Sequence, residues 1–427
     1  MRAVLLGLAG LVISVWVALS VHSQAEADWR PWRSGPDFGS REPARKDRAT
    51  ERPPTLQSVL ASRETLQAMS QAIERYQRLA SGGGWQPIPS GPRLKFGVRD
   101  DRVRHLRRRL EATGDLQPGR GDQSGFDHDV EAAVQRFQER HGLTPSGDVN
   151  QLTLRALNQS PQQLLHRLRL NRQRLEALVS SVSGRRYILV NIPAYELQAV
   201  SGGGLDLSSV VVVGKPATPT PELKAAVKAV DFLPYWHVPQ SIAQRALIPA
   251  VKKDPDYLER ERIRAFASWG GEEVDTSQVN WWSPQGERLV FRQDPGPFNA
   301  LGLIRIDIPN RHIVYMHDTP LKKLFSYYLR PYSAGCVRVD RVQDLTLWLL
   351  SGEGGWSAAR LADSLQSGRQ QTVTLSQPVP VHFAYISAWA TAGGEAHFRI
   401  DVYDKDGEGR QTVRLDDNSA DTRRVAP

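Results

Sequence analysis

The hydrophobic period of this chain changes at Ser183-Gly184, and no other feature limits its possible folds as strongly. Before that point, apolar residues recur at helical spacing, which predicts amphipathic helices. After it come short runs rich in β-branched residues, such as 187–192 and 210–213, which predict strands. With 427 residues, the chain has room for about two or three domains. We therefore expect an α+β multidomain protein in which helical segments precede a β-rich domain.

The helical part divides into three segments. The apolar positions from Leu56 to Tyr76 predict a helix that ends before Ser81-Gly82-Gly83-Gly84, so residues 55–92 form a helical scaffold segment. Residues 93–158 have the pattern of a compact module of three helices, the last of which begins at Val149 or Asn150. A longer apolar stripe predicts a further scaffold helix within residues 159–184.

The β-rich part is expected to form one domain over residues 185–378. Its predicted strands lie at 187–192, 195–200, 210–213, 289–292, 304–308 and 311–316. Residues 242–266 instead are helix-like and rich in both charges, so we expect an insertion at about 240–285 that caps a site. Residues 379–427 are expected to hold two strands, at 381–389 and 397–403, followed by a polar tail from Lys405.

The N-terminus has the composition of an export signal. No charged residue occurs between Arg2 and Glu26, and most of the intervening residues are apolar. Ala25-Glu26-Ala27 fits a signal-peptidase site, but the stretch is also near the ~18–20 residues that span a bilayer. Residues 1–27 are therefore either a cleaved signal peptide or an anchor in the inner membrane, and both predict export. Residues 28–54 have almost no aliphatic side chains and are expected to be a disordered linker.

The charge balance and the cysteine count exclude several classes of protein. With 55 Lys and Arg against 46 Asp and Glu, the net charge is +9, which favours anionic partners. Export and the lack of any nucleic-acid-binding motif argue against nucleic acid as that partner. A single cysteine, Cys336, allows no intramolecular disulfide and no multi-cysteine metal site. We expect neither a metal nor a cofactor.

Cys336 has neighbours that suit a nucleophile. His317 lies nineteen positions before it, far enough for the chain to return and place an imidazole beside the thiol. Gly335 permits the close backbone approach that an oxyanion site requires. Asp340 has the pattern of a helix N-cap, which would place the thiol just before the positive end of a helix. By themselves, a His and a Cys at this spacing also fit a half-buried structural histidine and an inert thiol.

Wider sequence similarity favours the catalytic interpretation. The stretch Tyr315-Met316-His317 and the motif Ser333-Ala334-Gly335-Cys336-Val337-Arg338 resemble the active site of the L,D-transpeptidases with a YkuD-type catalytic domain, particularly the large periplasmic members. Many relatives have a histidine directly before the Gly-Cys pair, where this chain has Ala334, so the base is expected to be His317. Residues 93–158, with the run 133–143, resemble the peptidoglycan-binding domain of bacterial wall enzymes.

The resemblance implies a sandwich-like catalytic domain and a role for each candidate residue. Cys336 would be the nucleophile and His317 the general base and acid, while the Tyr315 hydroxyl and the backbone of Cys336 and Gly335 would stabilise the oxyanion. Either a backbone carbonyl near Asp318 or Asp318 itself would orient the imidazole.

Three further residues are candidates for substrate binding. Arg338 has the planar fork that suits a substrate carboxylate, although a structural ion pair with Asp340 or Asp344 fits the sequence equally well. Ser333 is expected near the site as a local hydrogen-bonding residue. Trp236 is expected either to line the donor site or to pack in the core.

The reaction implied is acyl transfer on peptidoglycan stem peptides. Cys336 would form a thioester with a tetrapeptide stem and release D-Ala, and the amine of a second stem would give a 3→3 cross-link. Two alternatives stay open: an L,D-carboxypeptidase or endopeptidase that trims or detaches wall peptides, and a non-catalytic peptidoglycan-binding scaffold protein. The implied location is the periplasm, with a role in wall biogenesis and cell shape. The sequence does not indicate an oligomeric state.

Overall fold

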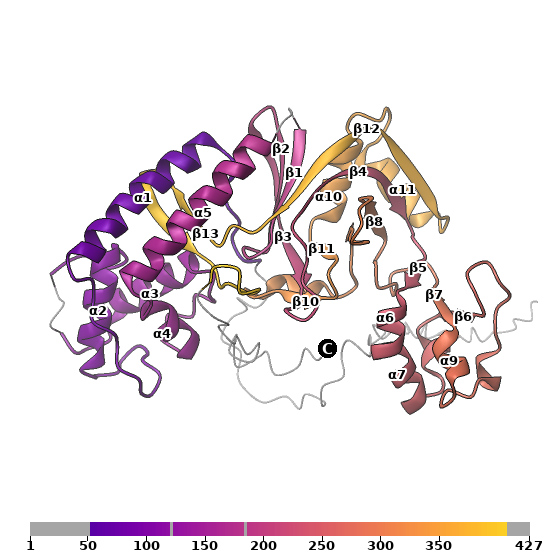
Figure 1. The fold of residues 1–427 in the computed structure, drawn as a ribbon, viewed down its shortest axis with the longest axis horizontal. Helices are drawn as coiled ribbons and strands as arrows, with labels where there is room; N and C mark the ends of the chain where they lie inside the picture. Colours follow the sequence, from indigo (N-terminus) through magenta and orange to yellow (C-terminus); the bar gives the residue numbers. More distant parts are fainter. Residues whose placement is uncertain (1–51, 120–122, 183–185, 408–427) are drawn as a thin grey trace, which may run out of the picture.

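A computed structural model describes residues 52–119, 123–182 and 186–407 (Figure 1). The expected leader at 1–27, nearly all of the expected linker at 28–54 and the chain beyond residue 407 lie outside these ranges. Among the residues described, no helix is long and apolar enough to cross a membrane.

The centre of the molecule is a nine-stranded sheet with the order β10-β3-β11-β9-β8-β4-β12-β1-β2. Because β2 pairs with β3 as well as with β1, the ladder closes on itself around one apolar core. Helices α10 and α11 add Leu345, Leu349 and Leu361 to that core. The strands and helices of this part are β1 (Arg186–Asn191), β2 (Glu196–Ser201), β3 (Gly204–Gly214), β4 (Leu223–Phe232), β8 (Ile304–Asp307), β9 (Met316–His317), β10 (Pro331–Ser333), β11 (Val337–Val339), β12 (Gln371–Ala384), α10 (Val342–Leu350), α11 (Ala358–Gln366) and the 3₁₀ turn η3 (Lys322–Ser326).

Two long helices, α1 (Arg63–Ser81) and α5 (Pro161–Ser181), lie together on the opposite side of the picture from the lobe that carries α7 and α9 (Figure 1). They pack around a hairpin of β13 (Ala388–Thr391) and β14 (Glu395–Phe398), joined by the 3₁₀ turn η4 (Ala392–Gly394). Their shared core includes Met69, Leu168 and Trp389. The two scaffold helices and the last two strands are thus one packed unit, although more than 200 residues separate them in the sequence.

The compact three-helix module is confirmed as α2 (Arg102–Thr113), α3 (His128–Arg140) and α4 (Gln151–Leu157). Side-chain caps set where two of these helices begin, since Asp127 accepts from the Val130 N–H and Asn150 from the Thr153 N–H. The module contacts the β13–β14 hairpin, where Arg140 Nη1 donates to the Ala396 carbonyl at 2.6 Å.

The insertion is larger and less helical than the sequence predicts. A separate apolar core runs from Trp236 to Leu301, wider than the expected 240–285, and it defines the insertion lobe of residues 236–301. Residues 263–266 form a strand at the end of the expected helix, and they belong to a second sheet ordered β5-β7-β6. The elements of the lobe are β5 (Trp236–Val238), α6 (Gln240–Ile242), the π-helix η1 (Ala243–Leu247), α7 (Ile248–Lys253), α8 (Tyr257–Arg260), β6 (Ile263–Phe266), the 3₁₀ turn η2 (Thr276–Gln278), α9 (Pro284–Arg288) and β7 (Val290–Gln293).

Other boundaries also differ from the sequence-based expectation. Helix α1 begins at Arg63 because Ser62 caps it, and it includes Ser81. Of the strand expected at 311–316, only Met316 joins a strand, because the Asn310 side chain holds the preceding residues in a turn. Strand β4 was not predicted from the sequence. Strand β12 extends across the expected domain boundary at 378/379, and the strand expected at 381–389 is interrupted at 385–387.

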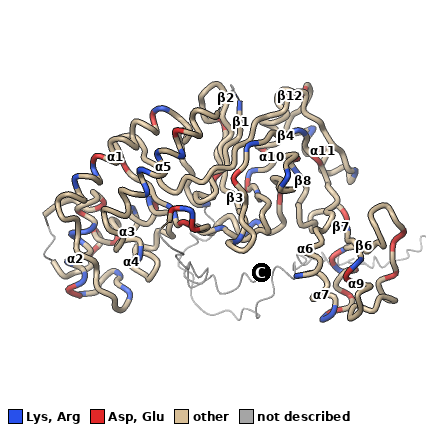
Figure 2. Tube along the Cα trace, viewed as in Figure 1, with Lys and Arg blue, Asp and Glu red and all other residues tan. Residues whose placement is uncertain are grey.

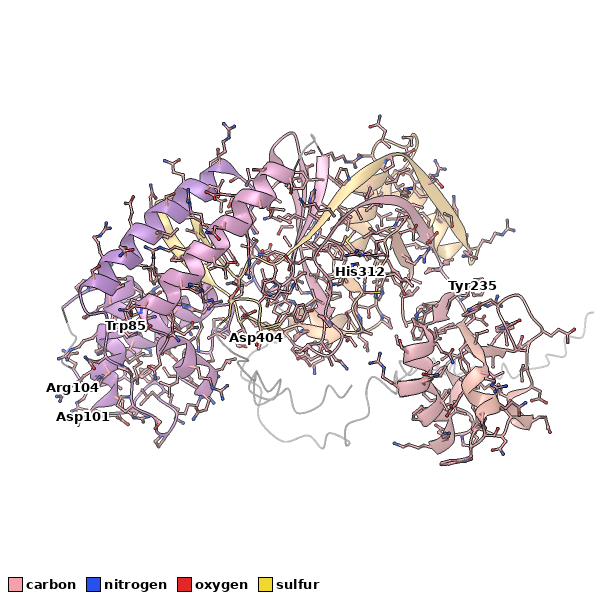
Figure 3. The ribbon with its side chains drawn as sticks, in the orientation of Figure 1. Trp85, Asp101, Arg104, Tyr235, His312 and Asp404 are labelled. Carbon is pink, nitrogen blue, oxygen red and sulfur yellow. The ribbon has the colours of Figure 1, made fainter. Side chains whose placement is uncertain are left out.

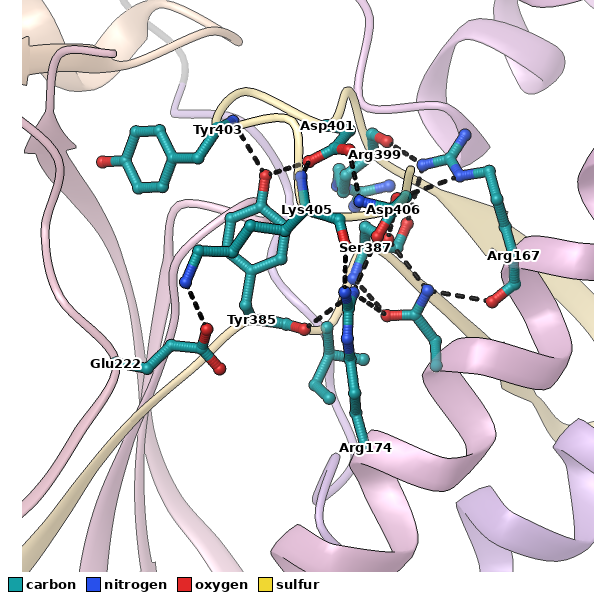
Figure 4. Close-up of polar contacts among 12 residues, drawn as sticks. Arg167, Arg174, Glu222, Tyr385, Ser387, Arg399, Asp401, Tyr403, Lys405 and Asp406 are labelled. Atoms are coloured by element: carbon teal, nitrogen blue, oxygen red, sulfur yellow. Dashed lines mark hydrogen bonds and ion pairs between the residues drawn. The ribbon is translucent and has the colours of Figure 1, made fainter. Parts of the chain in front are cut away.

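The polar tail begins later in the chain than the predicted start at Lys405. Asp406 is buried, and its carboxylate is bound by Arg167 and Arg174 of α5 (Figure 4). Burial of a carboxylate is tolerated here because cations pair with it. The described chain is therefore packed at least as far as Asp406.

Candidate active site

The register of two parallel strands brings the predicted catalytic residues together. In the β9–β11 ladder, Met316 pairs with Val337 and His317 pairs with Arg338. One step earlier, the Val337 N–H donates to the Tyr315 carbonyl at 3.0 Å, so Tyr315 lies beside Cys336. Since successive side chains alternate between faces, Tyr315 and His317 share a face, as do Cys336 and Arg338. The pair Tyr315 and His317 on one strand therefore lies next to the pair Cys336 and Arg338 on the neighbouring strand.

The thiol of Cys336 is held in its neutral form. Burial raises its pKa above the usual value, against the opposing influence of hydrogen bonds from the Tyr315 backbone and hydroxyl and of the charges on Arg338 and Arg305. Because the thiolate is the reactive form, this cysteine needs a base at neutral pH.

His317 has the properties of such a base. It is buried, and burial together with the charge on Arg338 lowers its pKa to about 3, although nearby carbonyls oppose the shift. Its Nδ1 lies 2.5 Å from the Asp318 backbone carbonyl, which can only accept a hydrogen bond. This contact favours the tautomer with the proton on Nδ1 and the lone pair on Nε2, although the Leu301 carbonyl also hydrogen-bonds to the imidazole.

The Asp318 carboxylate does not orient the imidazole. It binds Lys322 and accepts from the Leu303 N–H at 3.0 Å. The backbone carbonyl of the same residue contacts His317 instead. The sequence left open whether a backbone carbonyl or the Asp318 carboxylate orients the imidazole, and in the structure the group beside the imidazole is the carbonyl.

The turn before the cysteine is built by Ser333. Its Oγ accepts from the Gly335 N–H at 3.1 Å and donates to the Cys336 carbonyl at 2.5 Å. Gly335 has φ +123°, a conformation that side chains disfavour, which explains the glycine. Because its N–H is already bonded to Ser333, Gly335 is not a free oxyanion donor here, contrary to the sequence-based expectation.

The expected helix does not directly follow the cysteine. Strand β11 comes next, and α10 begins only at Val342. The Asp340 carboxylate pairs with Arg52 at 2.8 Å and makes no cap. The positive end of a helix therefore does not stabilise the thiolate. Hydrogen bonds from Tyr315 stabilise it instead.

Arg338 has none of the ion pairs that the sequence allowed. Asp340 is bound to Arg52, and Asp344 is bound to Arg341. The Nε of Arg338 is buried and has no hydrogen-bond partner among the described residues. This guanidinium group is thus available to a ligand.

The site opens into a cavity of about 430 Å³ between the sheet and the insertion lobe. The sheet side provides Tyr315, His317 and Cys336, and the lobe provides Trp236 and Arg245. Figure 3 labels two lining residues, Tyr235 where the lobe begins and His312 beside the sheet. Of the described residues that line the cavity, none is Asp or Glu. The charged side chains that line the cavity are therefore cationic, and several of the others are aromatic.

Trp236 lines this cavity as one of the two sequence-based interpretations expected, and it also supports Tyr315. Burial raises the pKa of the Tyr315 hydroxyl, against the opposing effect of a hydrogen bond with the Trp236 side chain. Tyr315 therefore keeps its proton and can donate it to a hydrogen bond with an oxygen or sulfur anion.

Arg305 is a site residue that the sequence analysis missed. It pairs with His317 across β8 and β9, and its guanidinium lies 5.5 Å from the centre of the Tyr315 ring. Asp231 on β4 holds it through Nε at 2.7 Å, and Thr372 donates to the same carboxylate at 2.6 Å. The alternation Ile304-Arg305-Ile306, with its one charge between two buried residues, is the signal that could have indicated it.

Comparison with known proteins matches two parts of the chain to family models. Residues 185–369 match the L,D-transpeptidase catalytic domain. Residues 99–157 match the family described as "Putative peptidoglycan binding domain". The first range contains every strand of the nine-stranded sheet except β12, and the second contains the three helices of the module.

A curated relative and several solved structures are also similar. The relative, from Haemophilus influenzae and named "Putative L,D-transpeptidase", is 30% identical over 57% of this chain. The chain spans about half of that protein's length, 48%. An L,D-transpeptidase from Mycobacterium smegmatis is 15% identical with a TM-score of 0.21, and covers 46% of this chain and 58% of its own. L,D-transpeptidase 3 from Mycobacterium tuberculosis is 13% identical with a TM-score of 0.24, and covers 46% and 60%.

Proposed function

We propose, from the premise that residues 185–369 belong to the L,D-transpeptidase catalytic domain family, that this protein cross-links peptidoglycan through a thioester on Cys336. The observation that carries the proposal is the β9–β11 register, which sets Tyr315 and His317 against Cys336 and Arg338 at a cavity without acidic lining. The peptidoglycan-binding-like module supports a wall polymer as substrate.

The first half of the reaction forms the acyl-enzyme. Nε2 of His317 takes the thiol proton as Sγ of Cys336 attacks the carbonyl of the third stem residue at its L-centre. The carbon–nitrogen bond to the terminal D-Ala breaks, and His317 returns the proton to the departing amine. The products are a thioester on Cys336 and free D-Ala, so no proton or electron pair is unaccounted for.

The second half transfers the acyl group. The side-chain amine of another stem attacks the thioester, His317 takes a proton from it, and Cys336 leaves as a thiol. The new amide joins two third residues, which is a 3→3 cross-link. With water in place of the amine, the same intermediate would give a carboxypeptidase, which is the alternative activity.

Two hydrogen-bond donors would stabilise the tetrahedral oxyanion in both halves. The Tyr315 hydroxyl already bonds toward Cys336 and is itself supported by Trp236. The backbone N–H of Cys336 is the second candidate. Loss of one such donor typically costs ~10²–10³ in rate. Arg338 would hold the carboxylate beside the scissile bond.

The location we propose is the periplasm, where peptidoglycan lies, because both family matches belong to wall-acting domains. Association with the inner membrane would depend on residues 1–27 and stays a proposal.

The test is to incubate the purified protein with a disaccharide-tetrapeptide and to measure products and intact protein by mass spectrometry. We expect cross-linked dimers, free D-Ala and a transient adduct on Cys336, with Cys336→Ala giving none of the three. Trimmed monomer alone would favour the carboxypeptidase. Dimer formation at the wild-type rate by Cys336→Ala would overturn the mechanism.

A further inference from the structure

Two cationic side chains, Arg245 and Arg338, line the active-site cavity, and a third cationic residue, Lys215, lies beside one of its lining residues, Ser333. Arg338 lies on β11, Arg245 lies in the π-helix of the insertion lobe, and Lys215 directly follows β3. The Lys215 N–H donates to the Ser333 carbonyl at 3.0 Å, which fixes residue 215 beside the turn that carries Cys336. Burial and the charges of Arg338 and Arg245 lower the pKa of Lys215, so the three groups are electrically close.

No acidic side chain compensates these charges within the cavity. Its described lining has neither Asp nor Glu, and the Arg338 Nε is buried without a hydrogen-bond partner. The one side-chain hydrogen bond described for Arg245 runs from Nε to the Ser241 carbonyl at 2.9 Å, and the residue is exposed. Like charges held together without counter-ions cost free energy, which an anionic ligand would recover.

Most other charged clusters in the described chain differ in this respect. Figure 2 shows basic and acidic positions interspersed over the helical part and the lobe. Arg264 on the lobe, for example, binds both Asp294 and Glu273. Two cations in the cavity and a third beside it, none with a described ion pair, are therefore not a consequence of the basic composition alone.

We propose that Arg245 and Lys215 form a second carboxylate-binding subsite, separate from the carboxylate position of Arg338. This rests on the proposed function, since the ligand is the donor stem. The enzyme would then require a stem with a free internal carboxylate in addition to its C-terminal one. A stem whose internal carboxylates are carboxamides would be a poor substrate, because an amide offers no charge to either cation.

Because Arg245 belongs to the insertion lobe, the lobe contributes directly to substrate choice. Arg338 belongs to the sheet and Lys215 directly follows β3, so a stem bound by these two residues and by Arg245 would connect the sheet to the lobe. The subsite acts on binding and not on the thiol, since the charges that act on Cys336 are those of Arg338 and Arg305.

The experiment compares two synthetic tetrapeptide stems that share a free C-terminal carboxylate. One has its internal carboxylates free, and the other has them converted to carboxamides. Acylation of Cys336 is followed by mass spectrometry of the intact full-length protein for wild type, Arg245→Gln, Lys215→Gln and the control Arg288→Gln. Arg288 is an exposed arginine of the same lobe outside the cavity lining, so its change removes the same charge from elsewhere.

For wild type and Arg288→Gln, we expect the free-acid stem to exceed the amidated stem by about 10- to 100-fold in kcat/KM. Arg245→Gln and Lys215→Gln should reduce this ratio toward one, mainly through KM, with an unchanged pH profile. A wild-type ratio near one with normal acylation would overturn the subsite and leave the transpeptidase proposal intact. A shifted pH profile in Arg245→Gln would also overturn it, because the charge would then act on the thiol. No acylation by either stem would contradict the proposed function itself.

Discussion

Arginines in two regions of this molecule, the polar cluster around Asp406 and the active-site cavity, differ in what neutralises them. In the polar cluster of Figure 4, the buried Asp406 carboxylate is bound by Arg167 Nε at 3.2 Å, by Arg174 Nη1 at 2.7 Å and by the Ser387 hydroxyl at 2.6 Å. At the active-site cavity, Arg338 has a buried Nε with no described partner, and no acid lines the walls.

The difference separates structural arginines from those available for binding. A guanidinium with its carboxylate already in place connects segments of chain, as Arg167 and Arg174 connect α5 to the residues after β14. A guanidinium without one has been desolvated at a cost, and a substrate carboxylate can offset that cost. Substitutions in the polar cluster should therefore lower the free energy of unfolding, whereas substitution of Arg338 should lower the rate of acylation.

The largest expected effect is in the polar cluster. Asp406→Asn leaves two arginines without their anion, so we expect the free energy of unfolding to fall by about 3–5 kcal/mol. Acylation by the remaining folded protein should be unchanged. Urea unfolding followed by fluorescence measures the first quantity, and Asp404→Asn, an exposed neighbour, is the control. A loss below about 1 kcal/mol would show that the cluster is not structural.

The opposite result is expected at the cavity. Arg338→Gln removes a partly buried cation that has no described ion pair, so stability should stay within about 1 kcal/mol of wild type, while kcat/KM falls by about 10²-fold, or roughly 2.7 kcal/mol. Arg341→Gln, an exposed arginine three residues further on, serves as the control in the same stem-acylation assay. Unfolding of Arg338→Gln under mild conditions would remove the distinction between the two regions.

Per pH unit, the smallest expected effect is the dependence of stability on the protonation of His317. Its pKa of about 3 in the folded chain lies below the unfolded value near 6.5, so unfolded chain binds the proton first. The stability that neutral His317 contributes is complete above pH 6.5 and is lost as pH falls toward 3, by up to about 1.4 kcal/mol per pH unit.

Unfolding measured between pH 7 and 4 would test this, with His317→Gln expected to reduce the slope by one proton. The buried His141 in the helical module, whose pKa is also lowered well below its ordinary value, should leave a remaining slope in that variant. In the acylation assay, the acid limb of the rate should lie far below pH 6.5. An inflection at pH 6.5 would mean that the imidazole is solvated.

Much of the site could be predicted because its residues are close in sequence. Tyr315, His317, Cys336 and Arg338 fall within one short strand–loop–strand stretch, and a family motif covers them. Arg305 and Asp231 were missed because they reach the site through sheet pairing, in which β4, β8 and β9 are neighbours. The prediction that Asp340 caps a helix was wrong because a tertiary partner, Arg52, binds the same carboxylate.

By itself, the sequence determined the local features: the switch from helices to strands, the three-helix module and the motif around the single cysteine. These depend on spacing, capping and backbone preference, which act over a few residues. Only the tertiary structure decided which charges are neutralised, since Asp406 meets Arg167 from more than 200 positions away while Arg338 has no ion pair with any acid among the described residues. Compensation of charge depends on distance in space, and a sequence pattern does not contain that distance.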